Sequence, residues 1–272
     1  IAARTGMLPA FLIIGGQKCG TTSLYRHLTA HPDIRPATVR EIGFFNTYER
    51  YSKGIGWYRS HFPSILRKLY TKLILGRNLL TGEADTSYII SPHALRRVSE
   101  ILPRVKLILI LRNPVDRAYS HFQHTRRIGR EWLSFEEALE RETERVGSAW
   151  QRMLEDERYH SMDIEYYSYA RRGIYADQVA VLLRLFPRSQ VLILQSEEFS
   201  VDPLRTYWQV SEFLQVRRWE PVHFERHNTG QYPNMSASTR RGLVDYFRPH
   251  NQRLYKCLGR SFTWDRWNEY FF

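Results

Sequence analysis

The fold of this chain is decided by residues 11–23, which read FLIIGGQKCGTTS. The apolar run Phe11–Ile14 has the length and composition of a buried β-strand, and it ends at a pair of glycines. A helical pattern begins after Thr22, with Leu24 and Leu28 on one face. The stretch therefore predicts a strand, a glycine turn and a helix.

The same unit recurs further along the chain. The apolar run 105–111 is a second buried-type strand, and Pro114 after it suits the first turn of a helix. Periodicity predicts a further strand over 191–194 and helices over 175–186, 203–214 and 236–258, the last interrupted at Pro249. Strands that alternate with helices predict an α/β fold: a single domain over 1–272 with a central parallel sheet flanked by helices.

Composition limits the classes of function. The 272 residues include 40 Lys and Arg against 28 Asp and Glu, a formal charge of +12 that attracts anions without choosing among nucleic acid, acidic glycan, lipid or phosphorylated cofactor. Cys19 and Cys257 have no metal-ligand spacing, which predicts a reducing compartment and no structural metal. The longest aliphatic run, 107–111, is far shorter than the roughly 20 residues of a transmembrane helix, so we expect no membrane span.

A charged segment of mixed sign occupies residues 128–160. This pattern is typical of a solvated helix pair, and we predict a helical insertion that borders the cleft where the substrate binds.

The glycine turn is suited to hold an anion. It lies where a strand meets a helix N-terminus, so unpaired backbone N–H groups and the helix dipole act on one point. Glycines permit close approach of the backbone, Lys18 adds a mobile positive charge, and hydroxyl groups add donors. The candidate ligands of a phosphate or sulfate are Gly16, Gln17, Lys18, Cys19, Gly20, Thr21, Thr22 and Ser23.

The order of residues disfavours a nucleoside triphosphate. A P-loop requires Gly-Lys followed by Ser or Thr, but Gly20 is followed by Thr21 and the lysine precedes that glycine. The second strand ends in Arg112, where a triphosphate enzyme usually has an Asp for Mg²⁺. A nucleotide kinase is therefore a weak alternative, and we predict no metal.

Arg112 and Ser120 offer a second anion site. A guanidinium fork and a hydroxyl on the following helix can converge on one phosphate. Two anion sites predict a ligand with two separated anionic groups, and a nucleotide with 5′ and 3′ substituents fits that description.

With these motifs the chain resembles the sulfotransferases that use 3′-phosphoadenosine 5′-phosphosulfate (PAPS), in particular the carbohydrate group of heparan sulfate N- and 3-O-sulfotransferases and bacterial sulfotransferase-domain proteins. The resemblance covers nearly the whole chain. It rests on the stretch 11–25, which is similar to the family's 5′-phosphosulfate loop, and on 109–120, which is similar to its 3′-phosphate motif. The resemblance implies that Arg112 and Ser120 bind the 3′-phosphate.

Further residues take roles that only the resemblance implies. Glu41, in the segment REIGFFN, stands where the family has its catalytic glutamate, and His124 stands where N-sulfotransferases have a functional histidine. The segment HNTGQYP at 227–233 is similar to a late loop that closes over the nucleotide, which adds Thr229, Gly230 and Gln231 to the binding residues. Lys18 is then expected to stabilise the leaving phosphate, with Glu41 or His124 as the base, PAPS as cofactor, PAP as product and no metal.

The acceptor is expected to be polar or anionic, a glycan or glycoconjugate hydroxyl or amine. Ala84 replaces the acceptor-contacting lysine of the heparan sulfate enzymes, which favours a bacterial relative in the cytoplasm, with the Golgi lumen as alternative if a membrane anchor was trimmed. A lipid or secondary-metabolite hydroxyl remains an alternative acceptor, and a non-catalytic module that binds anionic ligands remains an alternative function. We predict no nucleic-acid partner, and the sequence does not predict an oligomeric state.

Overall fold

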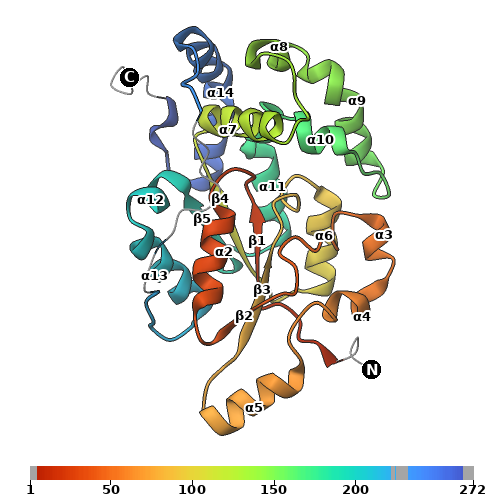
Figure 1. Ribbon diagram of the computed structural model, residues 1–272, viewed down its shortest axis with the longest axis vertical. Coiled ribbons are helices and arrows are strands. Elements are labelled where there is room, and N and C mark those ends of the chain that lie inside the picture. The colour runs from red at the N-terminus through yellow and green to blue at the C-terminus, as the bar shows by residue number, and fades with distance from the viewer. Residues whose placement is uncertain (1–4, 222–223, 225–231, 266–272) are drawn as a thin grey trace. The chain divides into compact units, whose positions relative to one another are not determined.

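The computed structural model describes residues 5–221, 224 and 232–265 (Figure 1). Their contacts divide the chain into two compact units. Unit 1 consists of Ile1–Leu111 and Leu185–Asn228, and unit 2 consists of Arg112–Arg184 and Thr229–Phe272. The division falls directly after the second predicted strand, between Leu111 and Arg112.

Unit 1 is built on a parallel sheet of five strands in the order β2-β3-β1-β4-β5. Each prediction of a strand is confirmed: Phe11 opens β1, and the other two predicted runs form β4 and β5. Phe11 lies opposite Gly82 on one side and Lys106 on the other, so β1 is central and fully buried. The strands are β1 (Phe11–Gly15), β2 (Ile34–Pro36), β3 (Leu80–Ala84), β4 (Lys106–Leu111) and β5 (Val191–Gln195).

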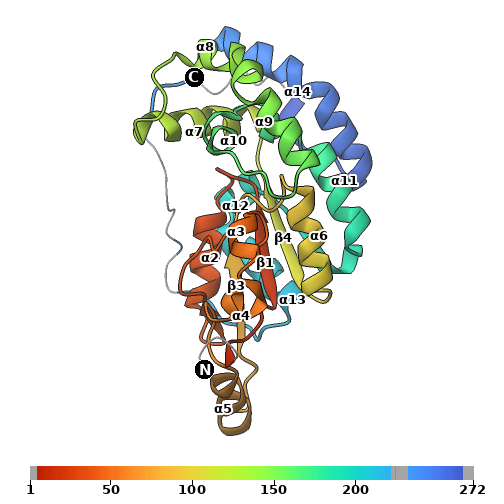
Figure 2. The ribbon, with the colours of Figure 1, turned by 90° about the vertical axis from the view of Figure 1, so that its right-hand side faces the viewer.

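Helices cover both faces of this sheet, as the α/β prediction required. Phe11, Ile13 and Ile108 share one buried cluster with residues of α2 and α13, whereas α6 lies on the opposite face (Figure 2). The helices of unit 1 are α2 (Thr21–Ala30), α3 (Tyr48–Tyr51), α4 (Gly54–Arg59), α5 (Ile65–Leu75), α6 (Pro92–Ile101), α12 (Ser196–Val201) and α13 (Pro203–Leu214).

Unit 2 is helical. Val115, Phe122 and Phe247 belong to its buried cluster, which joins α7, α8 and α14. The predicted start of α7 is confirmed, since Pro114 occupies the first turn and the Asn113 side chain accepts a hydrogen bond from the Val115 N–H at 3.0 Å. The helices are α7 (Pro114–Arg127), α8 (Phe135–Glu140), α9 (Glu142–Glu155), α10 (Met162–Tyr167), α11 (Tyr175–Leu185) and α14 (Ala237–Leu258).

Two expectations about helices meet different outcomes. The charged segment 128–160 does form helices, α8 and α9, whereas its place beside a substrate cleft stays a prediction. The predicted interruption at Pro249 is wrong, because α14 runs continuously through that residue. Phe247 and Leu254 are buried on either side of Pro249, and this packing offsets the one backbone hydrogen bond that proline removes.

Among the described helices, none is both long and apolar enough to cross a lipid bilayer.

Candidate functional site

The turn after β1 has a backbone that glycine makes possible. The Gly16 N–H donates to the Ile110 carbonyl at 2.7 Å, and the Cys19 N–H donates to the Gly16 carbonyl at 3.2 Å. Lys18 and Gly20 have φ angles of 65° and 96°, in the left-handed region. A Cβ atom at Gly16 would lie 3.0 Å from Cys19 Sγ and 3.3 Å from the Ile110 carbonyl oxygen, so a side chain there would have to displace its neighbours.

The turn leads into an N-terminus of α2 that suits an anion. Gly20 is the N-cap, no side chain caps the helix, and the first turn contains no acidic residue. An oxyanion placed at this end would meet the positive end of the helix dipole and the N–H groups of the first turn, with no acidic side chain there to repel it. The residues present thus fit a phosphate or sulfate group, as the 5′-phosphosulfate of PAPS would require.

The side chains predicted to line this turn lie in different surroundings. Lys18 and Gln17 are partly exposed, whereas Thr21 and Ser23 are 6% and 7% exposed. The Cys19 side chain is fully buried in the hydrophobic cluster that joins β1 to α2 and α13. It therefore packs the turn against the core and does not face solvent.

Arg40 connects the turn to Glu41. Its guanidinium donates to the Thr22 hydroxyl and forms an ion pair with Glu41, with 3.2 Å between Nη2 and Oε1. The Arg40 and Glu41 side chains are 38% and 46% exposed, so both remain accessible to solvent. A single guanidinium group therefore bridges the predicted base, Glu41, and the first turn of α2.

Two buried carboxylates hold the backbone that follows Glu41. The Ile42 N–H donates to Glu83 Oε1 at 3.1 Å, and the Gly43 N–H donates to Asp85 Oδ2 at 3.0 Å. Both acids stand at the carboxyl end of β3, and they are 0% and 4% exposed. We call Glu83 and Asp85 the carboxylate pair; it positions the segment that carries Glu41.

Tyrosine hydroxyls complete the surroundings of Glu83. Tyr58 donates to Oε2 at 2.6 Å, and Tyr88 donates to Oε1 at 2.8 Å. Burial, together with the charge of Asp85, raises the pKa of Glu83 to about 8, although these hydrogen bonds act in the opposite direction.

The second group of predicted residues belongs to unit 2. Arg112 lies between the end of β4 and the N-cap of α7, and its carbonyl accepts a hydrogen bond from the Tyr175 hydroxyl at 3.0 Å. Ser120 is a buried residue of α7, and His124 stands in the last turn of that helix, with its Nδ1 3.1 Å from Arg127 Nη2. Thr229, Gly230 and Gln231 lie outside the described residues.

Sequence reasoning missed the carboxylate pair and the tyrosines that contact it. Sequence reasoning singled out Ala84 and gave no role to the acidic residues on either side of it. Their one signal was their place at the end of a strand that itself went unrecognised. The metal prediction has no direct test: within the described ranges no three or more His, Cys, Asp or Glu gather as a metal site would need.

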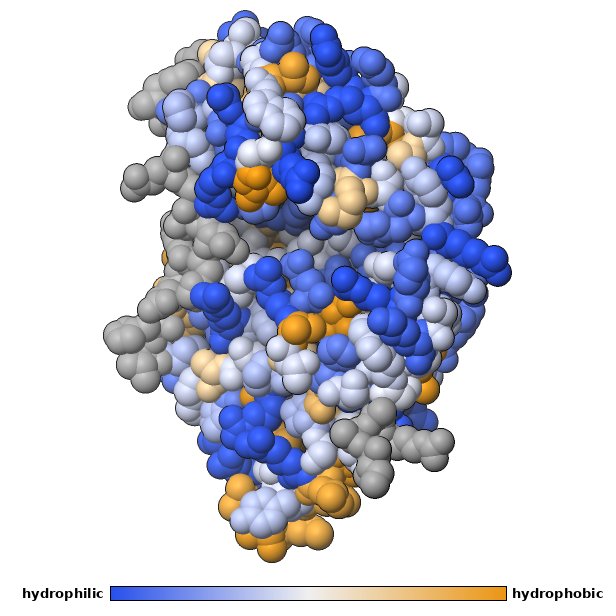
Figure 3. Space-filling model, turned by 45° about the vertical axis from the view of Figure 1, so that its right-hand side comes forward, coloured by the Kyte–Doolittle hydropathy of each residue, from blue (hydrophilic) through white to orange (hydrophobic). Residues whose placement is uncertain are grey.

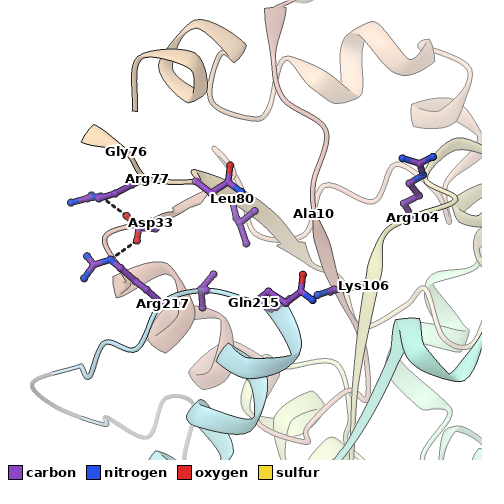
Figure 4. A pocket seen from close by; sticks show the side chains of 12 residues that line it. Ala10, Asp33, Gly76, Arg77, Leu80, Arg104, Lys106, Gln215 and Arg217 are labelled. Carbon is purple, nitrogen blue, oxygen red and sulfur yellow. Dashed lines mark hydrogen bonds and ion pairs between the residues drawn. The ribbon is translucent and has the colours of Figure 1, made fainter. Parts of the chain in front are cut away.

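A separate cavity of about 410 Å³ lies at the amino end of the sheet (Figure 4). Asp33 forms ion pairs there with Arg77 at 2.7 Å and with Arg217 at 2.6 Å, and Lys106 and Arg104 also line the cavity. In a parallel sheet all strands begin on one side and end on the other. This cavity lies where the strands begin, so it is remote from the turn that follows the end of β1.

Comparison with known proteins shows one consistent similarity. The sequence pattern of the family described as "Sulfotransferase domain" matches residues 8–261, and therefore spans both units. A crystal structure of a sulfotransferase from Alicyclobacillus acidocaldarius is 31% identical, with a TM-score of 0.73 over 96% of this chain and 100% of that one.

Curated relatives agree. The human bifunctional heparan sulfate N-deacetylase/N-sulfotransferase 3 is 32% identical over 92% of this chain, and the mouse heparan sulfate glucosamine 3-O-sulfotransferase 3B1 is 30% identical over 97% of it. This chain spans 30% of the length of the human relative and 66% of the length of the mouse relative. The family resemblance seen in the motifs is confirmed.

Proposed function

Because this chain belongs to the sulfotransferase domain family, we propose that it transfers the sulfuryl group of PAPS to a hydroxyl or amine of a polar acceptor. The observation that carries the proposal is the arrangement at the carboxyl end of β1. An uncapped helix N-terminus follows a glycine turn, and Arg40 connects its Thr22 to Glu41. An anion site and a carboxylate beside it are what in-line transfer from a phosphosulfate to an acceptor requires.

The turn would hold the phosphosulfate end of the donor. PAPS supplies the sulfuryl group, and PAP leaves when the bond between sulfur and the bridging oxygen breaks. Lys18 and the N–H groups of Gly20–Ser23 would stabilise the charge that develops on the leaving phosphate. The triphosphate alternative remains disfavoured by the position of Lys18 before Gly20.

Glu41 would act as the base. It takes the proton of the acceptor hydroxyl or amine while the new bond to sulfur forms. The Arg40 guanidinium contacts both Glu41 and the Thr22 hydroxyl, which supports this role. The carboxylate pair holds the backbone of the two residues that follow Glu41. His124 is the alternative base, and the third experiment below distinguishes the two.

Arg112 and Ser120 would hold the 3′-phosphate of the donor. Arg112 follows β4, whose neighbour in the sheet is β1, and its guanidinium matches the geometry of a phosphate. Ser120 would add a hydroxyl donor, and the family resemblance assigns Thr229, Gly230 and Gln231 to nucleotide binding as well.

The acceptor we propose is a glycan or glycoconjugate. The named relatives act on heparan sulfate, and the charge of +12 favours anionic or strongly polar partners. Ala84 stands where those enzymes have a lysine, so a heparan-like chain is not required. With two cysteines in 272 residues, we propose the cytoplasm of a bacterium as the site of action.

Three experiments test the proposal in sequence. Calorimetry with PAP beside ATP and Mg²⁺ should show binding of PAP alone; preference for ATP would favour a kinase.

Transfer from PAPS to a panel of desulfated glycans, glycolipids and phenols, read by mass spectrometry, should identify glycan products. With the best acceptor, Glu41→Gln should lower turnover and His124→Ala should keep it if Glu41 is the base, whereas the reverse result would make His124 the base.

A further inference from the structure

Helix α5 presents large apolar side chains to solvent. Leu73 is 78% exposed, Leu66 is 70% exposed and Ile74 is 65% exposed, whereas Thr71 is the residue that the helix buries. A contiguous apolar patch of this kind marks a surface that meets another apolar surface. Its members are Ile65, Leu66, Leu69, Tyr70, Leu73, Ile74 and Leu75.

Helix α5 is amphipathic, but its apolar face points towards solvent and not towards the core. At about 100° per residue, six of the seven fall within an arc of about 180° whose centre faces away from Thr71. Arg67 and Lys72 fall at the two borders of that arc. A surface helix normally buries its apolar arc against its own core. In α5 that arc faces solvent, flanked by cations.

The helix projects from the amino end of the sheet. Ser64 caps its first turn, Gly76 ends it with a φ of 62°, and the chain then enters β3 at Leu80. Figures 1 and 2 show α5 beyond β2 and away from the other helices of unit 1, and Figure 3 shows hydrophobic side chains gathered over it. The predicted donor site is at the opposite edge of the same sheet.

Charge distinguishes between possible occupants of this surface. Between Glu49 and Glu83 the chain has no acidic residue, whereas it contains Arg50, Lys53, Arg59, Arg67, Lys68, Lys72 and Arg77. A two-fold contact between copies of α5 would bring these cations against their own equivalents, which is unfavourable. An anionic surface is complementary to them.

We propose that α5 docks unit 1 on an anionic lipid surface. Eleven residues span about 16 Å, too short to cross a bilayer but long enough to lie in its interface. Leu66, Leu73 and Ile74 enter the acyl boundary, and Arg67 and Lys72 contact lipid phosphates. The donor site at the other edge of the sheet then faces the aqueous side, from which a polar acceptor approaches.

Vesicle sedimentation of the full chain tests this. Vesicles of phosphatidylglycerol and phosphatidylcholine should bind the protein, and pure phosphatidylcholine should bind it more weakly. The triple variant Leu66→Gln, Leu73→Gln, Ile74→Gln should lower partitioning by at least about tenfold, because it removes the inserted apolar area. Lys72→Gln should lower it about fivefold, the effect of one cation at an anionic surface.

Matched substitutions elsewhere separate α5 from the general charge of the protein. Val201→Gln changes an 86% exposed apolar residue on α12, and Lys256→Gln changes an exposed lysine on α14. Both variants should bind vesicles as the parent does. All the substituted side chains are exposed, so thermal unfolding and transfer to a soluble acceptor should be unchanged.

Two outcomes would overturn the proposal. If the triple variant binds vesicles as well as the parent, the charge of +12 binds them without α5. If the parent does not bind anionic vesicles but light scattering shows a dimer that the triple variant dissociates, the apolar patch is a contact between copies of the chain.

Discussion

The two ends of the sheet in unit 1 satisfy their buried acids in different ways. At the carboxyl end, Glu83 accepts hydrogen bonds from the Ile42 N–H and from two tyrosine hydroxyls, with no cation among these partners. At the amino end, Asp33 is neutralised by two arginines, Arg77 and Arg217, which are 36% and 48% exposed.

The difference indicates what each end does. Guanidinium groups on flexible stems tie elements together and tolerate small shifts. Backbone N–H groups bound to a buried carboxylate fix the path of the chain itself, here next to Glu41. Burial, followed by the charge of Asp85, raises the pKa of Glu83, so holding the path in this way disfavours the ionised form of that side chain. The contacts at the carboxyl end therefore fix the backbone next to Glu41, whereas those at the amino end join separate segments of the chain through ion pairs.

The largest expected effect follows from removing Glu83. Glu83→Ala leaves one backbone N–H and two tyrosine hydroxyls without their acceptor at a position that is 0% exposed. We expect a loss of about 3 kcal/mol or more in the free energy of unfolding, measured in urea. Glu100→Ala, which removes an exposed partner of Arg96, should cost less than about 1 kcal/mol. Equal losses would show that Glu83 holds nothing together.

Substitution of a lysine at each end of the sheet should affect kcat differently. Lys18→Ala removes a charge at the proposed leaving phosphate and should lower kcat about 10²-fold with PAPS saturating. Lys106→Ala, at the amino end of β4, should leave kcat within about twofold of the parent, since it lies at the edge remote from the turn. A near-normal kcat for Lys18→Ala would remove that residue from the mechanism.

The titration of Glu83 should appear in the pH dependence of stability. Its pKa of about 8 in the folded chain lies above the ordinary value of 4.5, so the folded state holds a proton that the unfolded state has released. This contribution is fully present below pH 4.5 and is lost as the pH rises towards 8. Glu83→Gln has no such proton, so the parent should lose stability relative to this variant between those values. A constant difference between the two curves would show that folding does not raise the pKa of Glu83.

The smallest effect belongs to the amino end. Asp33→Asn weakens two ion pairs whose arginines are partly exposed, so screening limits the loss to about 1 kcal/mol in the free energy of unfolding. Turnover and the KM for PAPS should stay at the parent values. A large fall in kcat would mean that the two ends are coupled.

The same contrast explains what the sequence could predict. The strand, turn and helix around Lys18 were visible because an apolar run followed by glycines depends on local chemistry alone. β3 was not visible, because its residues LTGEA include a glycine and an acid, and Glu83 is buried only through tyrosines far away in sequence. Pro249 read as a break for the same reason: the packing on either side of it is tertiary information. Motifs predicted where the donor would bind, and only the fold revealed the acids that hydrogen-bond the backbone after Glu41.

The most direct test of the account is the kinetics of Glu41→Gln. The amide keeps the shape of the side chain but cannot take a proton, so kcat should fall at least about 10²-fold while calorimetry shows unchanged affinity for PAP. Glu49→Gln, an exposed acid on the neighbouring α3, should match the parent in both measurements. A Glu41→Gln variant with parental kcat would contradict the account, because the carboxylate pair would then position a residue that the reaction does not use.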